Sequence, residues 1–322
     1  MQQRKKILSI LIKLLVGLGS SAIIYLRLKN DFTAEKLGLL YTSAFSISGI
    51  LCFIICLLLI PVNWGIETYK WKLITYPVEK INYKTATKSV YSGICLGNLA
   101  PGRATEFVAK IIFFKPENRA KITVLHFVGG MFQLSITIIT GLAALLYNLN
   151  QFSGESSWMA YLASGLGILI LTVLVVCICK LDYILKLVSK KIGKQNQVYD
   201  FKYPFTRGLI ARLFGFSFLR YSVFFLQMLL LISIFHTIDA SVCFGILLYF
   251  LITTLIPMIS VLEAAIRAAI ALVVFKDSGL SDTALALSSV LIWILNIIVP
   301  SIFGYVILLR QNFDFKFSGN KK

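Results

Sequence analysis

Charged residues are scarce in this chain. Asp, Glu, Lys and Arg make up only 14% of its 322 residues, whereas soluble domains contain about 25%. Hydrophobic residues make up 58%, and they fall in blocks long enough to cross a bilayer. A chain this apolar cannot cover itself with polar surface, so lipid must solvate much of it. The composition therefore predicts an integral membrane protein, and we expect it in the bacterial cytoplasmic membrane.

The sequence also lacks the motifs of the common enzyme classes. It has no nucleophile elbow, P-loop or HExxH pattern, and no loop is long enough to form a nucleotide-binding domain. Its six cysteines lie in apolar segments without metal-ligand spacing, and His126 and His236 form no metal motif. We therefore predict a protein that is not an enzyme and that uses no metal and no cofactor.

Acidic residues are the scarcer charge, with 14 Asp and Glu against 32 Lys and Arg, a net charge of +18. The basic excess lies in short loops between apolar blocks, where it sets membrane topology. It favours a cytoplasmic N-terminus and C-terminus, with only the segment 27–37 discordant. A basic cytoplasmic face attracts anionic lipid headgroups, so lipids rather than nucleic acid are the expected partners.

The apolar blocks predict an all-α polytopic membrane protein. Six segments have about 20 residues or more, enough for a hydrocarbon core of about 30 Å: 7–26, 38–61, 121–147, 158–179, 208–235 and 284–309. Two further regions are interrupted, 86–114 at Pro101 and Gly102, and 240–275 at Pro257. We expect each to form a re-entrant hairpin or broken helix, which requires protein or water around its unpaired backbone.

These elements predict one transmembrane domain, 1–322, built from inverted repeats. Repeat one covers about 7–147 and repeat two about 158–309, with a basic cytoplasmic linker at about 180–207. Each repeat contains one of the two hairpins, and the hairpins would enter from opposite faces. Transporters with this arrangement place their sites at the repeat interface.

Only two acidic residues lie deep in apolar sequence, Glu106 and Glu263, one in each predicted hairpin. Each is followed four positions later by a basic residue, Lys110 or Arg267, which shares its helix face. Charges at membrane depth usually serve a function, so we expect the two carboxylates to meet near the bilayer centre. The alternative is that both pairs are salt bridges that lock the hairpins in place.

Arg103 is the strongest candidate for a substrate contact. It follows the predicted turn at Pro101 and Gly102, where free backbone N–H groups and an arginine would form an anion site. A lipid phosphate is the natural anion in this setting, and Asn98 could donate from the other arm. The alternatives are that Arg103 snorkels to the interface or pairs only with Glu106.

Two other polar features carry predictions. Arg220 lies within a predicted span and is expected to line the cavity. The segment 63–77 mixes aromatic and basic residues and predicts an interfacial belt or amphipathic helix whose role is anchoring: Trp64, Tyr69, Lys70, Trp71, Lys72 and Tyr76.

The stretch GNLAPGRATEFVAKIIFFK (97–115) resembles the signature of the lysylphosphatidylglycerol-synthase transmembrane family, also called flippase-like. The stretch IPMISVLEAAIRAAIALVVF (256–275) resembles the second motif of that family. The resemblance implies a multi-span fold with re-entrant helices and a flippase for aminoacylated phosphatidylglycerol. It carries over onto Asn98, Pro101, Arg103, Glu106, Glu263 and Arg267.

The chain departs from that family at several positions. Thr105 replaces the glycine before the first glutamate, and Met258-Ile259-Ser260 replaces a glycine-rich run before the second. The soluble aminoacyl-transferase domain is missing, so we do not expect synthesis of lysyl-lipid.

The combined prediction is a flippase or transporter for a phospholipid or another lipid-linked anionic or zwitterionic headgroup. Two alternatives remain open at this point. One is a non-catalytic subunit or accessory of a lipid-modifying enzyme that transfers aminoacyl or glycosyl groups, and the other is a solute or ion carrier. The candidate protein partners are a second copy of the chain, in a homo-oligomer, or a transferase.

Overall fold

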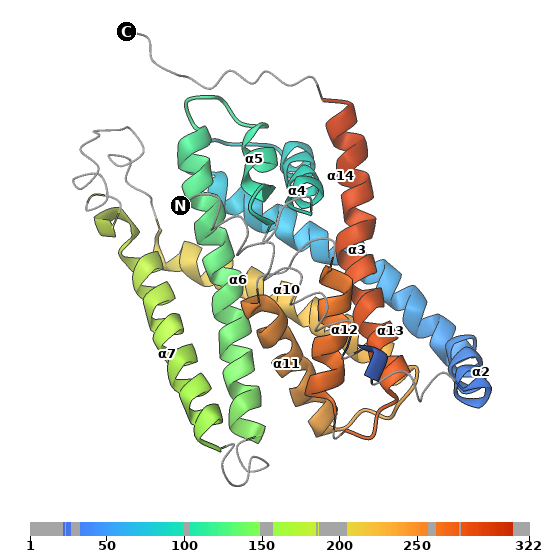
Figure 1. Cartoon of the computed structure of the whole chain (residues 1–322). Helices are drawn as coiled ribbons and strands as arrows, with labels where there is room; N and C mark the ends of the chain where they lie inside the picture. Colours follow the sequence, from blue (N-terminus) through green and yellow to red (C-terminus); the bar gives the residue numbers. More distant parts are fainter. Residues whose placement is uncertain are drawn as a thin grey trace, which may run out of the picture.

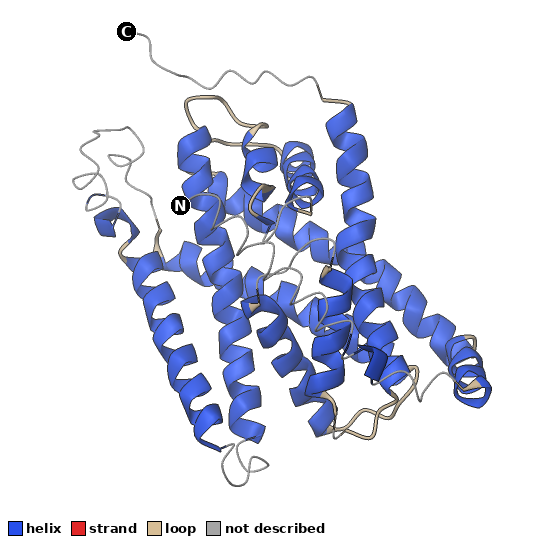
Figure 2. Cartoon of the chain, in the orientation of Figure 1, coloured by secondary structure: helices blue, strands red, loops and turns tan. Residues whose placement is uncertain are grey.

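The computed structural model describes residues 22, 24–26, 33–98, 103–148, 157–184, 186, 205–256, 262–276 and 278–311. All regular secondary structure in these ranges is helical (Figure 2). The arrangement of the helices is seen in Figure 1.

Five of the described helices are long and apolar enough to cross a membrane. They are α3 (Ile47–Thr75), α6 (Arg119–Asn148), α7 (Ser157–Cys179), α10 (Arg207–Ser233) and the continuous run α13 (Asp282–Trp293), η3 (Ile294–Ile298) and α14 (Val299–Leu309). They match five of the predicted spans and support an integral membrane protein. The sixth predicted span, 7–26, lies almost entirely outside the described residues.

The second predicted span, 38–61, has different boundaries in the structure. The chain forms α2 (Ala34–Ala44), breaks, and starts α3 at Ile47. The Ser46 side chain caps this new start by accepting a hydrogen bond from the Gly49 backbone N–H at 3.0 Å. Helix α3 then continues through Pro61 to Thr75, so the predicted interfacial belt is the second half of this long helix.

The two interrupted regions each form a pair of short helices. The first pair is α4 (Tyr83–Gly97) and α5 (Glu106–Ile111), and the second is α11 (Ala240–Leu255) and α12 (Glu263–Val274). Helix α4 has 15 residues and is about 22 Å long, which is shorter than a hydrocarbon core of roughly 30 Å. The predicted breakers Pro101, Gly102 and Pro257 lie outside the described residues. In Figure 1, α4 and α5 lie toward the upper end of the molecule, and α11 and α12 toward the opposite end.

Elements of the two predicted repeats pack against each other in matching pairs. Helix α3 packs on α10, α4 packs on α14, and α11 packs on α6. The first helix of each predicted hairpin therefore contacts the last span of the other predicted repeat. Helix α7 is peripheral, because 11% of its apolar window is buried, compared with 50% for α6. The predicted linker at 180–207 falls largely outside the described residues.

Candidate functional site

A cavity of about 870 Å³ lies among the packed helices. Its lining comes from α3, α5, α6, α10, α11, α12, α13 and η3, and so from both predicted repeats. Aromatic rings form much of the wall, and charged side chains gather on one part of it. The charged residues of the lining are Glu67, Lys70, Arg103, Glu106, Lys110, Arg220 and Arg267.

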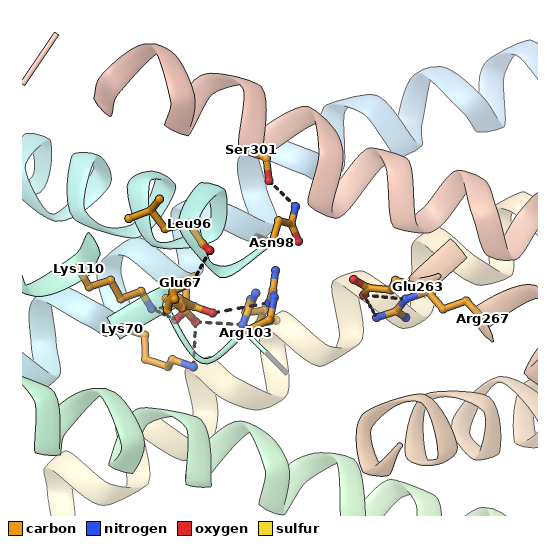
Figure 3. Close-up of polar contacts among 12 residues, drawn as sticks. Glu67, Lys70, Leu96, Asn98, Arg103, Lys110, Glu263, Arg267 and Ser301 are labelled. Atoms are coloured by element: carbon orange, nitrogen blue, oxygen red, sulfur yellow. Dashed lines mark hydrogen bonds and ion pairs between the residues drawn. The ribbon is translucent and has the colours of Figure 1, made fainter. Parts of the chain in front are cut away.

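Glu67 of α3 joins three of the cations. Its carboxylate lies 2.9 Å from Lys70 Nζ, 3.2 Å from Arg220 Nη1 and 3.7 Å from Lys110 Nζ. Lys110 also pairs with Glu106 at 2.9 Å. The cluster thus connects α3, α5 and α10, as the left part of Figure 3 shows for its labelled members.

The spacing of residues along α3 places Glu67 in this position. Ile60, Trp64, Glu67, Trp71 and Ile74 recur at helical spacing and are all buried, so they share one face of the helix. That face turns toward the cavity, while Tyr69 and Tyr76 remain exposed. The aromatic residues of the segment 63–77 are therefore divided between an inner wall and an outer surface.

Two of the cations also stack on tryptophan rings of α3. Lys110 Nζ lies 5.0 Å from the Trp71 ring centroid, and the Arg220 guanidinium carbon lies 4.8 Å from that of Trp64. A cation over an indole face is attracted by the negative face of the ring. The rings thus help to hold long basic side chains in defined positions.

Helix α5 lies close to α4 because α4 carries glycines at 93 and 97. A Cβ on Gly93 would lie 2.8 Å from Lys110 Cγ, and one on Gly97 would lie 3.1 Å from Glu106 Cβ. Thr105, immediately before α5, donates a hydrogen bond to the Leu96 carbonyl. The two small residues therefore make room for the charged side chains of α5.

Arg103 has an unusual backbone and a partly unpaired side chain. Its φ is 57°, in the left-handed region that non-glycine residues seldom adopt. Its Nη1 lies 3.9 Å from Glu106 Oε2, whereas Nε and Nη2 are buried without a hydrogen-bond partner. These last two atoms form one edge of the guanidinium, the edge that binds carboxylate or phosphate side-on.

Helix α12 carries a separate ion pair. Arg267 Nε and Nη2 donate to Glu263 Oε1 at 3.1 and 2.8 Å. Arg267 lines the cavity and Glu263 does not. Figure 3 shows this pair apart from the Glu67 cluster.

A chain of buried amides extends from the charged cluster toward η3. Arg220 Nε donates to Asn63 Oδ1 at 3.2 Å, and Asn63 Nδ2 donates to Asn296 Oδ1 at 2.7 Å. Asn296 Nδ2 in turn donates to Gln227 Oε1 at 2.9 Å. Asn296 lies within the π-helical segment η3, and such segments often occur at functional sites. This chain ties α3, α10 and the last span together beside the cavity.

The structure brings together most of the predicted site residues. Arg103, Glu106, Lys110, Arg220 and Arg267 all line the cavity, and both predicted pairs at four-residue spacing form. Asn98 is not among the lining residues and instead donates to Ser301 of α14 at 2.7 Å. Its amide therefore joins the end of α4 to the last span.

The expectation that Glu106 and Glu263 meet is not met. Each carboxylate is held by the cation one helical turn away, and the carboxylate that shares a cluster with Glu106 is Glu67. Sequence reasoning missed Glu67 and Lys70 because aromatic and basic residues surround them, as in an interfacial segment. The signal for them was the spacing of Trp64, Glu67 and Trp71, which places an acid between two tryptophans on one helix face.

No protein-family model matches the chain, and no curated protein is similar to it in sequence. The resemblance of its two short motifs to the flippase-like family therefore stays a prediction. Within the described residues, no group of three or more His, Cys, Asp or Glu is placed to hold a metal ion.

Proposed function

We propose that this protein moves a lipid with an anionic headgroup across the membrane. The observation that carries the proposal is the charged cavity of about 870 Å³ inside a bundle of membrane-length helices. Charges within a membrane protein are costly unless they are paired or face a polar path. A lipid transporter needs such a polar interior, because the polar headgroup must cross the hydrocarbon core. The acyl chains can stay in the hydrocarbon core throughout.

In this proposal Arg103 holds the headgroup phosphate. The side-on edge of its guanidinium, Nε and Nη2, is buried and has no partner, and that edge matches two oxygens of a phosphate. Glu67 and Glu106 balance part of the positive charge around it. Glu263 holds Arg267, which lines the cavity apart from the Glu67 cluster.

The packing of the helices supports an inverted-repeat mechanism. In the predicted repeats, α4 corresponds to α11, α6 to the last span, and α3 to α10. The contact of α4 with α14 therefore has its counterpart in the contact of α11 with α6, and α3 packs on its own counterpart, α10. The cavity lies where the repeats meet, as it does in transporters that work by rocking one repeat against the other. The two hairpins would then alternately open and close the cavity from opposite faces.

Liposome transport tests the proposal. The purified chain is reconstituted with fluorescent phosphatidylglycerol, and dithionite is added outside to reduce the label in the outer leaflet. Wild-type protein should expose the inner label to reduction. Arg103→Gln should slow this at least about tenfold, because it removes a charge-assisted contact worth about 1.5–3 kcal/mol.

Arg310→Gln is the matched control, because Arg310 is exposed at the end of α14, and it should behave as wild type. Protection of the inner label equal to that of protein-free liposomes would contradict the proposal. So would equal rates for Arg103→Gln and wild type.

A further inference from the structure

The charges of the Glu67 cluster do not cancel. Four cations, Lys70, Arg103, Lys110 and Arg220, share two carboxylates, Glu67 and Glu106. The formal balance is four minus two, an excess of +2. The Glu263–Arg267 pair adds nothing, because it is neutral in itself.

Bulk water does not screen this excess well. The side chains of Lys70 and Lys110 are 4% and 3% exposed, those of Glu67 and Arg220 are 11% exposed, and that of Glu106 is 15% exposed. Arg103, at 35%, is the most exposed member of the cluster. Buried charge that lacks a counter-charge is strongly unfavourable. An anion in the cavity would lower that free-energy cost. The larger the negative charge of the anion, up to two, the more of the positive excess it would neutralise.

Arg103 shows where such an anion would bind. In Arg267 the side-on edge of the guanidinium holds a carboxylate through Nε and Nη2. In Arg103 the same two atoms are buried and have no partner. The Trp64 and Trp293 indole N–H groups, which also belong to the cavity lining, are likewise buried without an acceptor. The cavity therefore offers positive charge together with several donors that lack an acceptor, which suits a group rich in oxygen.

We infer that the cavity takes a dianionic phosphate headgroup, a phosphomonoester or a diphosphate, in preference to a phosphodiester with a single charge. The inference rests on the proposed function and narrows its substrate class. A dianion brings the cluster to neutrality, whereas a monoanion leaves one positive charge uncompensated. A lysyl ester of phosphatidylglycerol carries more ammonium groups than phosphate charges, so it would add to the excess instead of cancelling it.

The test compares binding of two lipids that differ in headgroup charge. Short-chain phosphatidic acid and phosphatidylglycerol with identical acyl chains are titrated onto the purified full chain in detergent, and complexes are counted by native mass spectrometry. At about pH 8, where a phosphomonoester carries close to two charges, phosphatidic acid should bind at least about tenfold more tightly. This preference should fade as the pH is lowered through about 6, because the phosphomonoester then becomes a monoanion.

Two variants move the charge balance in opposite directions. Arg103→Gln lowers the excess by one and should reduce the preference for phosphatidic acid. Glu106→Gln raises the positive excess by one and should increase the preference for phosphatidic acid. A purely structural role would not move the ratio of the two dissociation constants in opposite directions, and Lys84→Met, at an exposed position of α4, should leave it unchanged.

A preference that is absent in wild type, or that does not change with pH, overturns the inference. If the liposome assay shows lipid movement without such a preference, the inference fails and the proposed function stands. A competition experiment with inorganic phosphate distinguishes a lipid headgroup from a free phosphate ion as the bound anion. If inorganic phosphate displaces phosphatidic acid at equal concentration, the cavity binds the free dianion, and the lipid function fails while the charge inference stands.

Discussion

Glu67 is the residue on which the charged cluster depends most. It contacts three cations that come from α3, α5 and α10, and its neighbours on the helix are tryptophans that hold two of those cations. Removing a buried carboxylate leaves the cations around it facing one another.

We therefore expect Glu67→Gln to destabilise the protein by about 3–5 kcal/mol, the range found when one partner of a buried ion pair is removed. Reversible unfolding in mixed micelles, followed by circular dichroism, measures this change. Glu117→Gln is the control, because Glu117 is exposed, and its effect should stay within about 0.5 kcal/mol. A change for Glu67→Gln as small as that of the control would mean that the cluster contributes nothing to folding.

At this scale the sequence predicted part of the site. It identified Arg103, Glu106, Lys110, Arg220 and Arg267, because a charge inside an apolar segment stands out. It missed Glu67, since the segment around it resembles the membrane interface, where charge is ordinary. The spacing of Trp64, Glu67 and Trp71 indicated one helix face, and the packing of α3 against α10 and α6 shows that this stretch is interior.

At the scale of the element, close helix contacts hold the first hairpin in place. Gly304 of α14 faces the Tyr91 backbone carbonyl of α4, and a Cβ there would overlap that carbonyl. Small residues permit such close approach in membranes, so in this conformation the contact sets the distance between α4 and the last span.

Gly304→Ala should lower stability by about 1–3 kcal/mol through overpacking, because the obstacle is backbone and cannot turn aside. Thermal unfolding in detergent measures it. Gly165→Ala provides the comparison, since nothing lies within 4 Å of a Cβ at that position of α7. Equal melting temperatures for the two variants would show that α4 and α14 are not held as closely as described.

The amide chain beside η3 provides a second prediction at this scale. Asn63→Leu leaves Arg220 Nε without its acceptor and Asn296 Oδ1 without its donor, at a cost of about 1–3 kcal/mol for each buried group left unpaired. The double change with Asn296→Leu should cost less than the sum of the two single changes, because the second change removes a group that the first had left unpaired. Additive costs in denaturant titrations would contradict a coupled chain.

Element boundaries were the weakest part of the sequence-based prediction. The end of the second span was placed at residue 61, where proline follows a long apolar run, but Pro61 lies within a helix that continues to Thr75. A proline often ends a soluble helix; in a membrane helix, neighbouring groups can satisfy the freed carbonyl. The two interrupted regions each form a pair of helices, whereas their re-entrant course stays a prediction, because the breakers lie outside the described residues.

At the scale of the whole molecule, the proposed rocking requires contacts between the repeats to change. Asn98 and Ser301 bridge the first hairpin and the last span through a hydrogen bond of 2.7 Å. In a background with the six native cysteines replaced by alanine, Asn98→Cys and Ser301→Cys place two thiols at this contact. Oxidation should stop lipid movement in liposomes, and reduction should restore it, because the covalent link holds α4 against α14.

Each single cysteine variant, oxidised in the same way, is the control and should stay active. Undiminished transport by the oxidised double variant, with the link verified by mass spectrometry, would mean that α4 and α14 move as one body. Alternating access would then need another pair of elements to separate.

The overall architecture was predicted in its main outline. Five apolar helices of membrane-spanning length overlap predicted spans, because a run of about 20 apolar residues has few alternatives to a membrane helix, although α3 begins and ends later than predicted. The reciprocal packing of α4 on α14 and α11 on α6 could not be read from the sequence, since hydropathy gives the order of the helices and not their neighbours.

The placement of the tryptophans has a practical consequence. Of the four in the chain, Trp64, Trp71 and Trp293 belong to the cavity wall, and Trp158 is exposed on α7. Ultraviolet emission from the unlabelled protein is therefore weighted toward the cavity interior, and Trp158→Phe would remove the one emitter outside it. The molecule thus carries a built-in optical reporter, with which occupancy can be followed in real time without attaching a dye.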